Sequence, residues 1–147
     1  MEKIPFSELE IRPQNRKKVI RRYSRLNFGI DTETYQGKVK LICDSFGRKF
    51  YPKSYHELLE FLCYFQYRNK FGFFWNIKYD FESVVKWFPL DNVRELLEWG
   101  KTRIDGYHIQ YLDGKYFEIS RSKHKSRFYD MTNFLPLSLE TASRKYL

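Results

Sequence analysis

Apolar and polar positions along the chain predict a succession of strands and helices from residue 26 onward. Short stretches rich in aromatic and β-branched residues have the composition of strands, and Gly37 and the pair Asp113-Gly114 mark tight turns between them. The predicted strands cover residues 26–34, 38–43, 48–51, 71–75, 107–112, 116–120 and 128–131. The run 71–75 is apolar throughout, which is typical of a central strand covered on both faces.

Helical stretches separate several of these strands. Ser54, followed three residues later by Glu57, forms a capping box, and the apolar residues behind it predict a helix that ends near Tyr67. Asp80 opens a second helix, which Pro89 closes. Two further helices are predicted at residues 91–100 and 137–147. Three strands thus precede a helix, a strand, two helices, a hairpin, a strand and a helix, an order that predicts a mixed α/β sheet with an antiparallel start.

The composition fits one folded domain that does not span a membrane. The 147 residues are 42% hydrophobic and 20% aromatic, which is enough for one core. No apolar run reaches the roughly 20 residues of a transmembrane helix, and the amino-terminal segment lacks the apolar stretch of a secretory signal. We therefore expect a cytoplasmic protein, in the host cell cytoplasm if it is viral. Cys43 and Cys63 lack the spacing of a zinc site, so we expect two buried free thiols.

The charge is strongly basic and unevenly distributed. Lys and Arg total 27 against 18 Asp and Glu, and the net charge of +9 favours a polyanion as partner. Residues 12–25 carry many Lys and Arg and no acid, so we interpret residues 1–25 as a basic N-terminal arm; a solvated helix face without a binding role is the alternative. In a second basic stretch the cations alternate with other residues, so a strand would place them all on one face. This stretch consists of Arg121, Lys123, Lys125 and Arg127.

Two acids in the segment FGIDTETYQG carry the first candidate chemistry. Asp31 and Glu33 lie two positions apart on a predicted strand, so both side chains leave the same face, with Cα atoms roughly 6 to 7 Å apart. Like charges held side by side on an interior strand repel unless a cation lies between them. Apolar Phe28 and Ile30 favour an interior strand, and the alternative is an edge strand with two solvated acids.

A third carboxylate occurs in the segment FWNIKYDFES. Asn76 ends the aromatic strand and Asp80 begins the next helix, so both can converge on the sheet edge that carries the first pair. Carboxylate oxygens that hold a pair of hard divalent cations form an arrangement used to hydrolyse phosphodiesters. Taken alone, however, Asp80 is better explained as a helix N-cap.

Together these segments resemble the DnaQ-like 3′–5′ exonuclease superfamily. The spacing Asp31-x-Glu33 is similar to its first motif, and Asn76-x-x-x-Asp80 is similar to its second. The segment FFWNIKYDFESVVKWF looks like the second motif in the proofreading domains of protein-primed family B DNA polymerases. The segment GKYFEISRSKHKSRFYDMTNFLPLSLETASRKYL is similar to the region after that motif in those domains, which comprises a hairpin, a strand ending in Tyr-Asp and a helix. The likeness covers residues 26–147, and the ordered set of motifs carries it.

The resemblance implies a ribonuclease H-like sheet with an inserted β-hairpin, Mg²⁺ or Mn²⁺ as cofactor, and two-metal-ion removal of nucleotides from the 3′ end of single-stranded DNA. Carried over by position, it makes Asp31, Glu33 and Asp80 catalytic metal ligands. It also implies that Thr32 and Thr34 flank the 3′-terminal nucleotide and that Asn76 contacts the strand or orients a ligand. Because Lys and Arg neutralise phosphates, the candidates for contacts with the strand backbone are Lys78, Lys123, Lys125 and Arg127. Tyr79 and Phe81 are expected in the core.

The third motif of that superfamily, Tyr-x-x-x-Asp on a later helix, does not occur in the sequence, so we expect the domain 26–147 to lack its last helix. Asp130 is a further candidate metal ligand, with capping of the next helix as the alternative. The expected partners are a single-stranded DNA 3′ end and a polymerase module or replication proteins. A catalytically inactive nucleic-acid-binding protein with the same fold and a small DNA-coating viral protein are the alternative functions.

Overall fold

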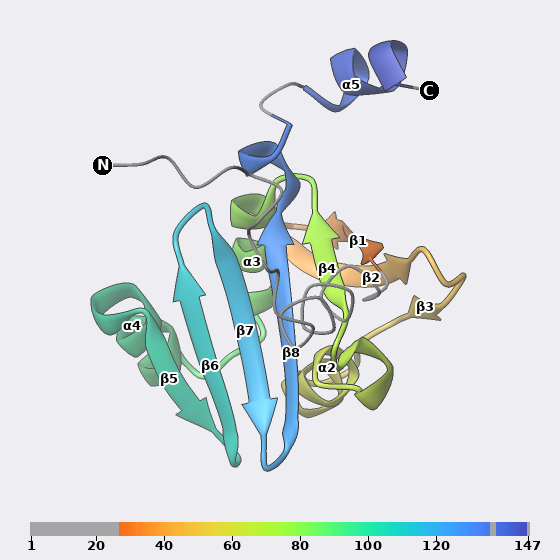
Figure 1. The fold of residues 1–147 in the computed structure, drawn as a ribbon. Coiled ribbons are helices and arrows are strands. Elements are labelled where there is room, and N and C mark those ends of the chain that lie inside the picture. The colour runs from red at the N-terminus through yellow and green to blue at the C-terminus, as the bar shows by residue number, and fades with distance from the viewer. Residues whose placement is uncertain (1–26, 136–137, 147) are drawn as a thin grey trace, which may run out of the picture.

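The computed structural model describes residues 27–135 and 138–146 and has an eight-stranded sheet at its centre (Figure 1). The strands are β1 (Asn27–Tyr35), β2 (Lys38–Asp44), β3 (Lys49–Phe50), β4 (Phe71–Phe74), β5 (Lys101–Ile104), β6 (Tyr107–Leu112), β7 (Tyr116–Arg121) and β8 (His124–Asp130). Their order across the sheet is β3-β2-β1-β4-β8-β7-β6-β5. The basic arm expected at residues 1–25 lies outside the described residues.

The sheet is mixed, and helices flank it. β1 runs parallel to β4 and β4 parallel to β8, whereas β2 is antiparallel to both β1 and β3. On the other side of β8, the strands β7, β6 and β5 continue the sheet with antiparallel pairing. The prediction of a mixed α/β sheet that begins with antiparallel strands is therefore confirmed.

The described part of the chain also contains four α-helices and two short 3₁₀ helices, of which the last two follow β8. They are α2 (Tyr55–Leu62), η2 (Phe65–Tyr67), α3 (Ile77–Val85), α4 (Leu90–Trp99), η3 (Met131–Asn133) and α5 (Leu139–Tyr146). The predicted capping box is present, because the Ser54 hydroxyl accepts a hydrogen bond from the Glu57 N–H at 3.2 Å. None of the helices described is long and apolar enough to cross a membrane.

The second predicted helix begins earlier than expected. Asn76 occupies the N-cap position of α3 without a side-chain capping bond, and Asp80 lies inside the first turn. The prediction that Asp80 begins this helix as its N-cap is therefore wrong, since its carboxylate binds the Thr32 hydroxyl of β1 instead. The last helix begins at Leu139, after Ser138 accepts a hydrogen bond from the Thr141 N–H at 3.1 Å.

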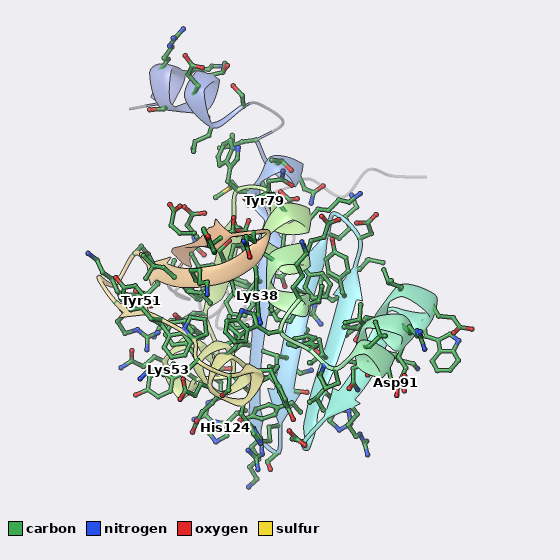
Figure 2. The ribbon with its side chains drawn as sticks, turned by 180° about the vertical axis from the view of Figure 1, so that it is seen from behind. Lys38, Tyr51, Lys53, Tyr79, Asp91 and His124 are labelled. Atoms are coloured by element: carbon green, nitrogen blue, oxygen red, sulfur yellow. The ribbon has the colours of Figure 1, made fainter. Side chains whose placement is uncertain are left out.

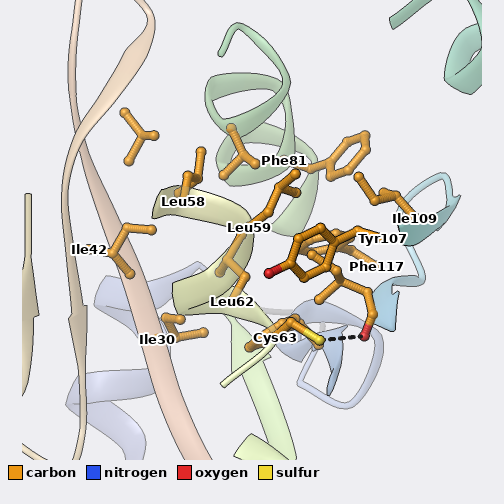
Figure 3. Close-up of a cluster of buried hydrophobic side chains, with 14 of the residues drawn as sticks. Ile30, Ile42, Leu58, Leu59, Leu62, Cys63, Phe81, Tyr107, Ile109 and Phe117 are labelled. Atoms are coloured by element: carbon orange, nitrogen blue, oxygen red, sulfur yellow. Dashed lines mark hydrogen bonds between the residues drawn. The ribbon is translucent and has the colours of Figure 1, made fainter. Parts of the chain in front are cut away.

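The core lies between one face of the sheet and the helices α2 and α3 (Figure 3). Leu58, Leu59 and Leu62 of α2 are fully buried. They lie with Phe81 of α3 among inward-facing side chains of the strands, such as Ile42 (Figure 3). The alternation along β1 places Phe28, Ile30 and Thr32 on this covered face and leaves the intervening side chains on the opposite, open face. The layered packing thus fixes which residues each strand presents outward.

A glycine in β4 leaves room for two aromatic rings of this core. Gly72 lies opposite Phe28 of β1 and Phe128 of β8 in the parallel pairing. A Cβ atom at Gly72 would lie 2.6 Å from the Phe128 ring and 2.7 Å from the Phe28 ring. The two rings therefore use the space that a side chain would fill, and the close approach requires glycine.

The expected inserted hairpin is larger than the sequence predicted. β5, which the pattern did not predict, pairs with β6 through a turn at Asp105-Gly106, where both residues have positive φ. β8 begins at His124 rather than at residue 128 and pairs with β7 along its whole length. The insertion is thus a three-stranded meander that widens the sheet beyond β8.

Candidate functional site

The carboxyl ends of the parallel strands bring several predicted site residues to one edge of the sheet. β4 and β8 end side by side, since Phe74 pairs with Asp130, and β1 runs in the same direction (Figure 1). Asn76 follows β4 directly, and Asp31 and Glu33 lie in the second half of β1. We call this edge of the sheet, with Asp31 and Glu33, the acidic edge; it is where the sequence predicted the site.

Asp31 and Glu33 share one face of β1, as their spacing predicted. Both are exposed on the open face, opposite the buried Thr32 between them. β1 pairs with β4 over Asn27–Gly29 and with β2 from Ile30 to Tyr35. At the two acids the strand therefore has one paired neighbour, β2, as in the alternative of an edge strand with two solvated acids.

Neither acid of this pair has a salt-bridge partner in the described part of the chain. Among the described residues, every salt bridge of 4.0 Å or less involves other carboxylates, although the chain carries a net charge of +9. By contrast, Asp44, at the end of the neighbouring strand, binds the Arg48 guanidinium at 2.8 Å and the Tyr67 hydroxyl at 2.8 Å. Two adjacent acids without a basic partner are suited to an external cation.

Asp80 reaches the same strand from α3. Its carboxylate accepts a hydrogen bond of 2.6 Å from the Thr32 hydroxyl, although the two residues are 48 positions apart. Asp80 is only 4% exposed. Burial raises the pKa of Asp80 to about 6, and the negative charge of Asp31 acts in the same direction, whereas the hydrogen bonds from Thr32 lower it. The buried acid therefore interacts electrostatically with Asp31 of the exposed pair.

The three carboxylates do not form a closed cage. Within residues 27–135 and 138–146, no group of three His, Cys, Asp or Glu side chains is close enough to hold a metal ion. Asp80 is bound by Thr32, whose side chain leaves β1 on the face opposite Asp31 and Glu33. The geometry is thus an exposed pair of acids with a buried third acid on the other side of the strand. Metal ligation by the trio stays a prediction.

The residues expected around a terminal nucleotide differ in exposure. Thr32 is buried and its hydroxyl is bonded to Asp80, so it does not face an incoming strand. Thr34 Oγ1 lies 2.9 Å from Tyr79 Oη. Tyr79 is 54% exposed at the end of the molecule that carries the acids (Figure 2), so the prediction of a core position is wrong, whereas Phe81 is buried as predicted. Asn76 and Lys78 are exposed beside this edge.

Asp130 has the structural role that the sequence left as an alternative. It is 4% exposed, and its carboxylate accepts hydrogen bonds from the Thr132 N–H at 2.8 Å and the Thr132 hydroxyl at 2.5 Å. These bonds make Asp130 the N-cap of η3. One of its carboxylate oxygens is thus taken up by the cap, which favours capping over metal ligation.

An aromatic hollow of about 660 Å³ opens beside Asp31 on the open face. Its apolar walls come from Phe73, Trp75, Met131 and Phe134, among other residues. Phe73 and Trp75 are half-buried, so the expectation that the 71–75 strand is covered on both faces is wrong on this side. The size of the hollow and its rings suit an unpaired nucleobase, which stacks on aromatic faces.

The predicted basic row splits between two sides of the β7–β8 hairpin. Lys123, Lys125 and Arg127 line a hollow of about 410 Å³ together with Arg68 and Lys70. Arg121 instead binds the Tyr107 hydroxyl at 3.2 Å and lines a different hollow, so the prediction that all four cations share one face is wrong. The turn at Ser122, with φ of 53°, breaks the alternation of a single strand.

The sequence reasoning missed Arg68, Lys70 and the aromatic hollow. Arg68 and Lys70 lie in the connection between η2 and β4, where no periodic pattern marks their direction. Phe134 comes directly after the 3₁₀ helix that Asp130 caps. Comparisons with models of protein families, with curated proteins and with solved structures find no match to this chain.

Proposed function

We propose that the chain is a divalent-metal-dependent 3′–5′ exonuclease domain of the proofreading type, which hydrolyses single-stranded DNA from its 3′ end. The hydrogen bond between Thr32 and Asp80 carries the proposal, because it joins the two motif segments at the carboxyl edge of the sheet. In this proposal the domain works at a DNA 3′ end beside a polymerase module or replication proteins.

The strand arrangement supports a ribonuclease H-like fold as part of this proposal. The strands β3, β2, β1, β4 and β8 are neighbours in that order, with β2 antiparallel to its neighbours and β1, β4 and β8 parallel. The two carboxylates of the first motif lie on the central strand of these five, and α3 comes after the next strand. Ligands of open α/β sheets bind outside the carboxyl ends of parallel strands, which is where these acids lie.

The donor set fits a hard divalent cation that a substrate phosphate helps to hold. Mg²⁺ keeps several waters and is usually bound by one or two carboxylates plus substrate phosphates rather than by a complete protein cage. Asp31 and Glu33 supply two exposed carboxylates without a basic partner among the described residues. A bound Mg²⁺ or Mn²⁺ supplies a more acidic water and offsets the charge on the leaving oxygen.

The other residues of the edge have supporting tasks in this proposal. Asp80, whose pKa is raised to about 6 by burial, adds negative charge to the edge when it ionises, and a cation near Asp31 favours that ionised form. The exposed ring of Tyr79 and the aromatic hollow beside Asp31 provide surfaces for unstacked bases. Stacking of this kind contributes about 1 to 3 kcal/mol per base and does not depend on sequence.

A nuclease assay with matched variants tests the proposal. The substrate is a single-stranded oligonucleotide labelled at its 5′ end, incubated with Mg²⁺ or Mn²⁺ and resolved on a sequencing gel. We expect a ladder that shortens from the 3′ end, its loss in EDTA, and its loss in Asp31→Asn. Asp91→Asn is the control, because Asp91 is an exposed acid on α4. Equal cleavage by Asp31→Asn and the control would contradict the assignment.

A non-catalytic nucleic-acid-binding domain is the second candidate function. It is favoured by the lack of a three-carboxylate group among the described residues and by the basic hollow at the start of β8. Under this candidate, EDTA leaves strand binding unchanged and no metal supports cleavage. The same gel, read beside a binding assay in EDTA, therefore separates the two functions.

A further inference from the structure

The basic hollow lies at the opposite end of the sheet from the carboxylates. Lys123 precedes β8 and Lys125 is its second residue, whereas Asp130 ends the same strand at the acidic edge. The five residue steps from Lys125 to Asp130 span about 17 Å. Figure 2 shows the same separation, with His124 labelled at the lower end of the sheet and Tyr79 near its upper end. The hollow is therefore a separate surface from the candidate nuclease site.

Two segments far apart in sequence, residues 68–71 and 123–129, build the hollow. Arg68, Asn69 and Lys70 come from the connection before β4, and Phe71 is the first residue of that strand. Lys123 comes from the β7–β8 turn, and Lys125, Arg127 and Tyr129 come from the open face of β8. The Lys70 ammonium donates to the backbone carbonyl of Gln66, which holds this side chain near its own loop.

The cations of the hollow exceed the acids that could neutralise them. Glu118 of β7 pairs with Lys125 at 3.4 Å and with the Arg127 Nε at 2.7 Å. In the part of the chain that the structure describes, Arg68 and Lys123 take part in no salt bridge. Five cations thus surround the hollow, and one acid offsets part of their charge. Such a surface attracts a polyanion.

Aromatic rings in the same hollow indicate which polyanion fits. Phe71 and Tyr129 line the hollow and are half-buried, with ring centroids 6.0 Å apart. Arg127 is also placed over the ring of Tyr116, with 4.5 Å from the guanidinium carbon to the ring centroid. Cations that follow a backbone beside rings on which bases stack are the recognition pattern of single-stranded nucleic acids. The side chains of an Asp- and Glu-rich peptide carry no aromatic rings that could stack on Phe71 and Tyr129.

We infer that this hollow is a second binding site for single-stranded nucleic acid, which holds the phosphate backbone without a metal ion. The site does not depend on the proposed nuclease chemistry. If both sites act on one strand, the basic hollow binds the internal nucleotides and the acidic edge receives the end.

Fluorescence anisotropy of a labelled oligothymidylate in EDTA tests the site on the full chain. The variant Arg68→Gln/Lys123→Gln removes two of the three cations of the hollow that have no salt bridge among the described residues, so it leaves no carboxylate unpaired. The control Lys49→Gln/Lys53→Gln removes the same charge from exposed lysines outside the hollow. We expect the first variant to bind about tenfold more weakly and to lower the slope of log K against log salt by about 1.4, whereas the control keeps the wild-type slope.

Two further measurements keep the inference testable if a variant is unstable. An oligonucleotide carrying 5-iodouracil, crosslinked to the wild-type protein, should label Phe71 or Tyr129 in peptide mapping; labelling confined to other regions overturns the inference. Equal loss of binding in the two double variants also overturns it, because binding then follows net charge alone. The inference is also overturned if polyglutamate displaces the labelled strand as effectively as unlabelled oligothymidylate does. All binding is measured in EDTA, where no metal-dependent cleavage takes place, so a failure of the nuclease proposal leaves this result readable.

Discussion

The two ends of the open sheet face differ in whether their acidic side chains have basic partners. At the basic end, Glu118 is buried and paired with both Lys125 and Arg127, so part of the charge is balanced inside the protein. At the acidic edge, Asp31 and Glu33 have no basic partner among the described residues, and Asp80 is buried against a neutral hydroxyl. The basic end therefore balances part of its charge within the protein, whereas repulsion among the carboxylates of the acidic edge favours an external cation.

The largest effect is expected at the acidic edge. Glu33→Gln keeps the shape of the side chain but removes one of the two exposed carboxylates, so we expect Mn²⁺-dependent nuclease activity to fall by about 100-fold or more. Single-turnover assays with excess enzyme measure this loss. Glu98→Gln, at an exposed acid on α4, is the matched control. Wild-type activity in Glu33→Gln would show that the pair does not hold the catalytic cation.

Asp80 provides a stability test of the same edge without metal. Burial raises the pKa of Asp80 to about 6 from its ordinary value of 3.8. Between these two pH values the folded protein holds a proton that the unfolded chain has lost, so the stability contributed by protonated Asp80 falls as the pH rises toward 6. The stability of Asp80→Asn does not fall with pH in this way. At pH 7.5 in EDTA the substitution should therefore raise the free energy of unfolding by on the order of 2 kcal/mol.

Urea denaturation of the wild type and Asp80→Asn between pH 4 and pH 8 measures this difference. The two stability curves should lie together near pH 4 and separate as the pH approaches 6. Asp91→Asn, at an exposed acid, should follow the wild type throughout. Parallel curves for the wild type and Asp80→Asn would mean that burial of Asp80 does not destabilise its charged form.

The corresponding change at the basic end should have the opposite sign. Glu118→Gln leaves Arg127 and Lys125 without their shared carboxylate, so we expect the free energy of unfolding to fall by about 1 to 2 kcal/mol. Oligonucleotide binding in EDTA should become slightly tighter, because the hollow gains net positive charge. Thermal melts and anisotropy titrations measure both effects. A more stable Glu118→Gln protein would remove the contrast between the two ends.

The alternation of a strand was enough to place Asp31 and Glu33 together, because residues two positions apart on a strand share a face. This holds independently of the rest of the fold. The turn signals Gly37 and Asp113-Gly114 likewise located two hairpins correctly. These features are local, so one segment of sequence determines them.

The features that the sequence missed depend on contacts between distant segments. The bond from Thr32 to Asp80 explains why Asp80 lies inside α3 rather than capping it, and nothing in either segment predicts that partner. β5 is only four residues long and comes directly after the α4 C-cap Gly100, so its alternation is too short to recognise. Arg68 and Lys70 join the basic hollow only because β4 pairs beside β8.

Crystals soaked in Mn²⁺ together with a short oligothymidylate would show whether the acidic edge binds a cation, because anomalous scattering locates the ion without reference to activity. We predict an anomalous peak in contact with the carboxylates of Asp31 and Glu33, on the open face of β1, and its loss in Asp31→Asn. Well-diffracting crystals that hold the oligonucleotide but show no peak at these two residues would contradict it.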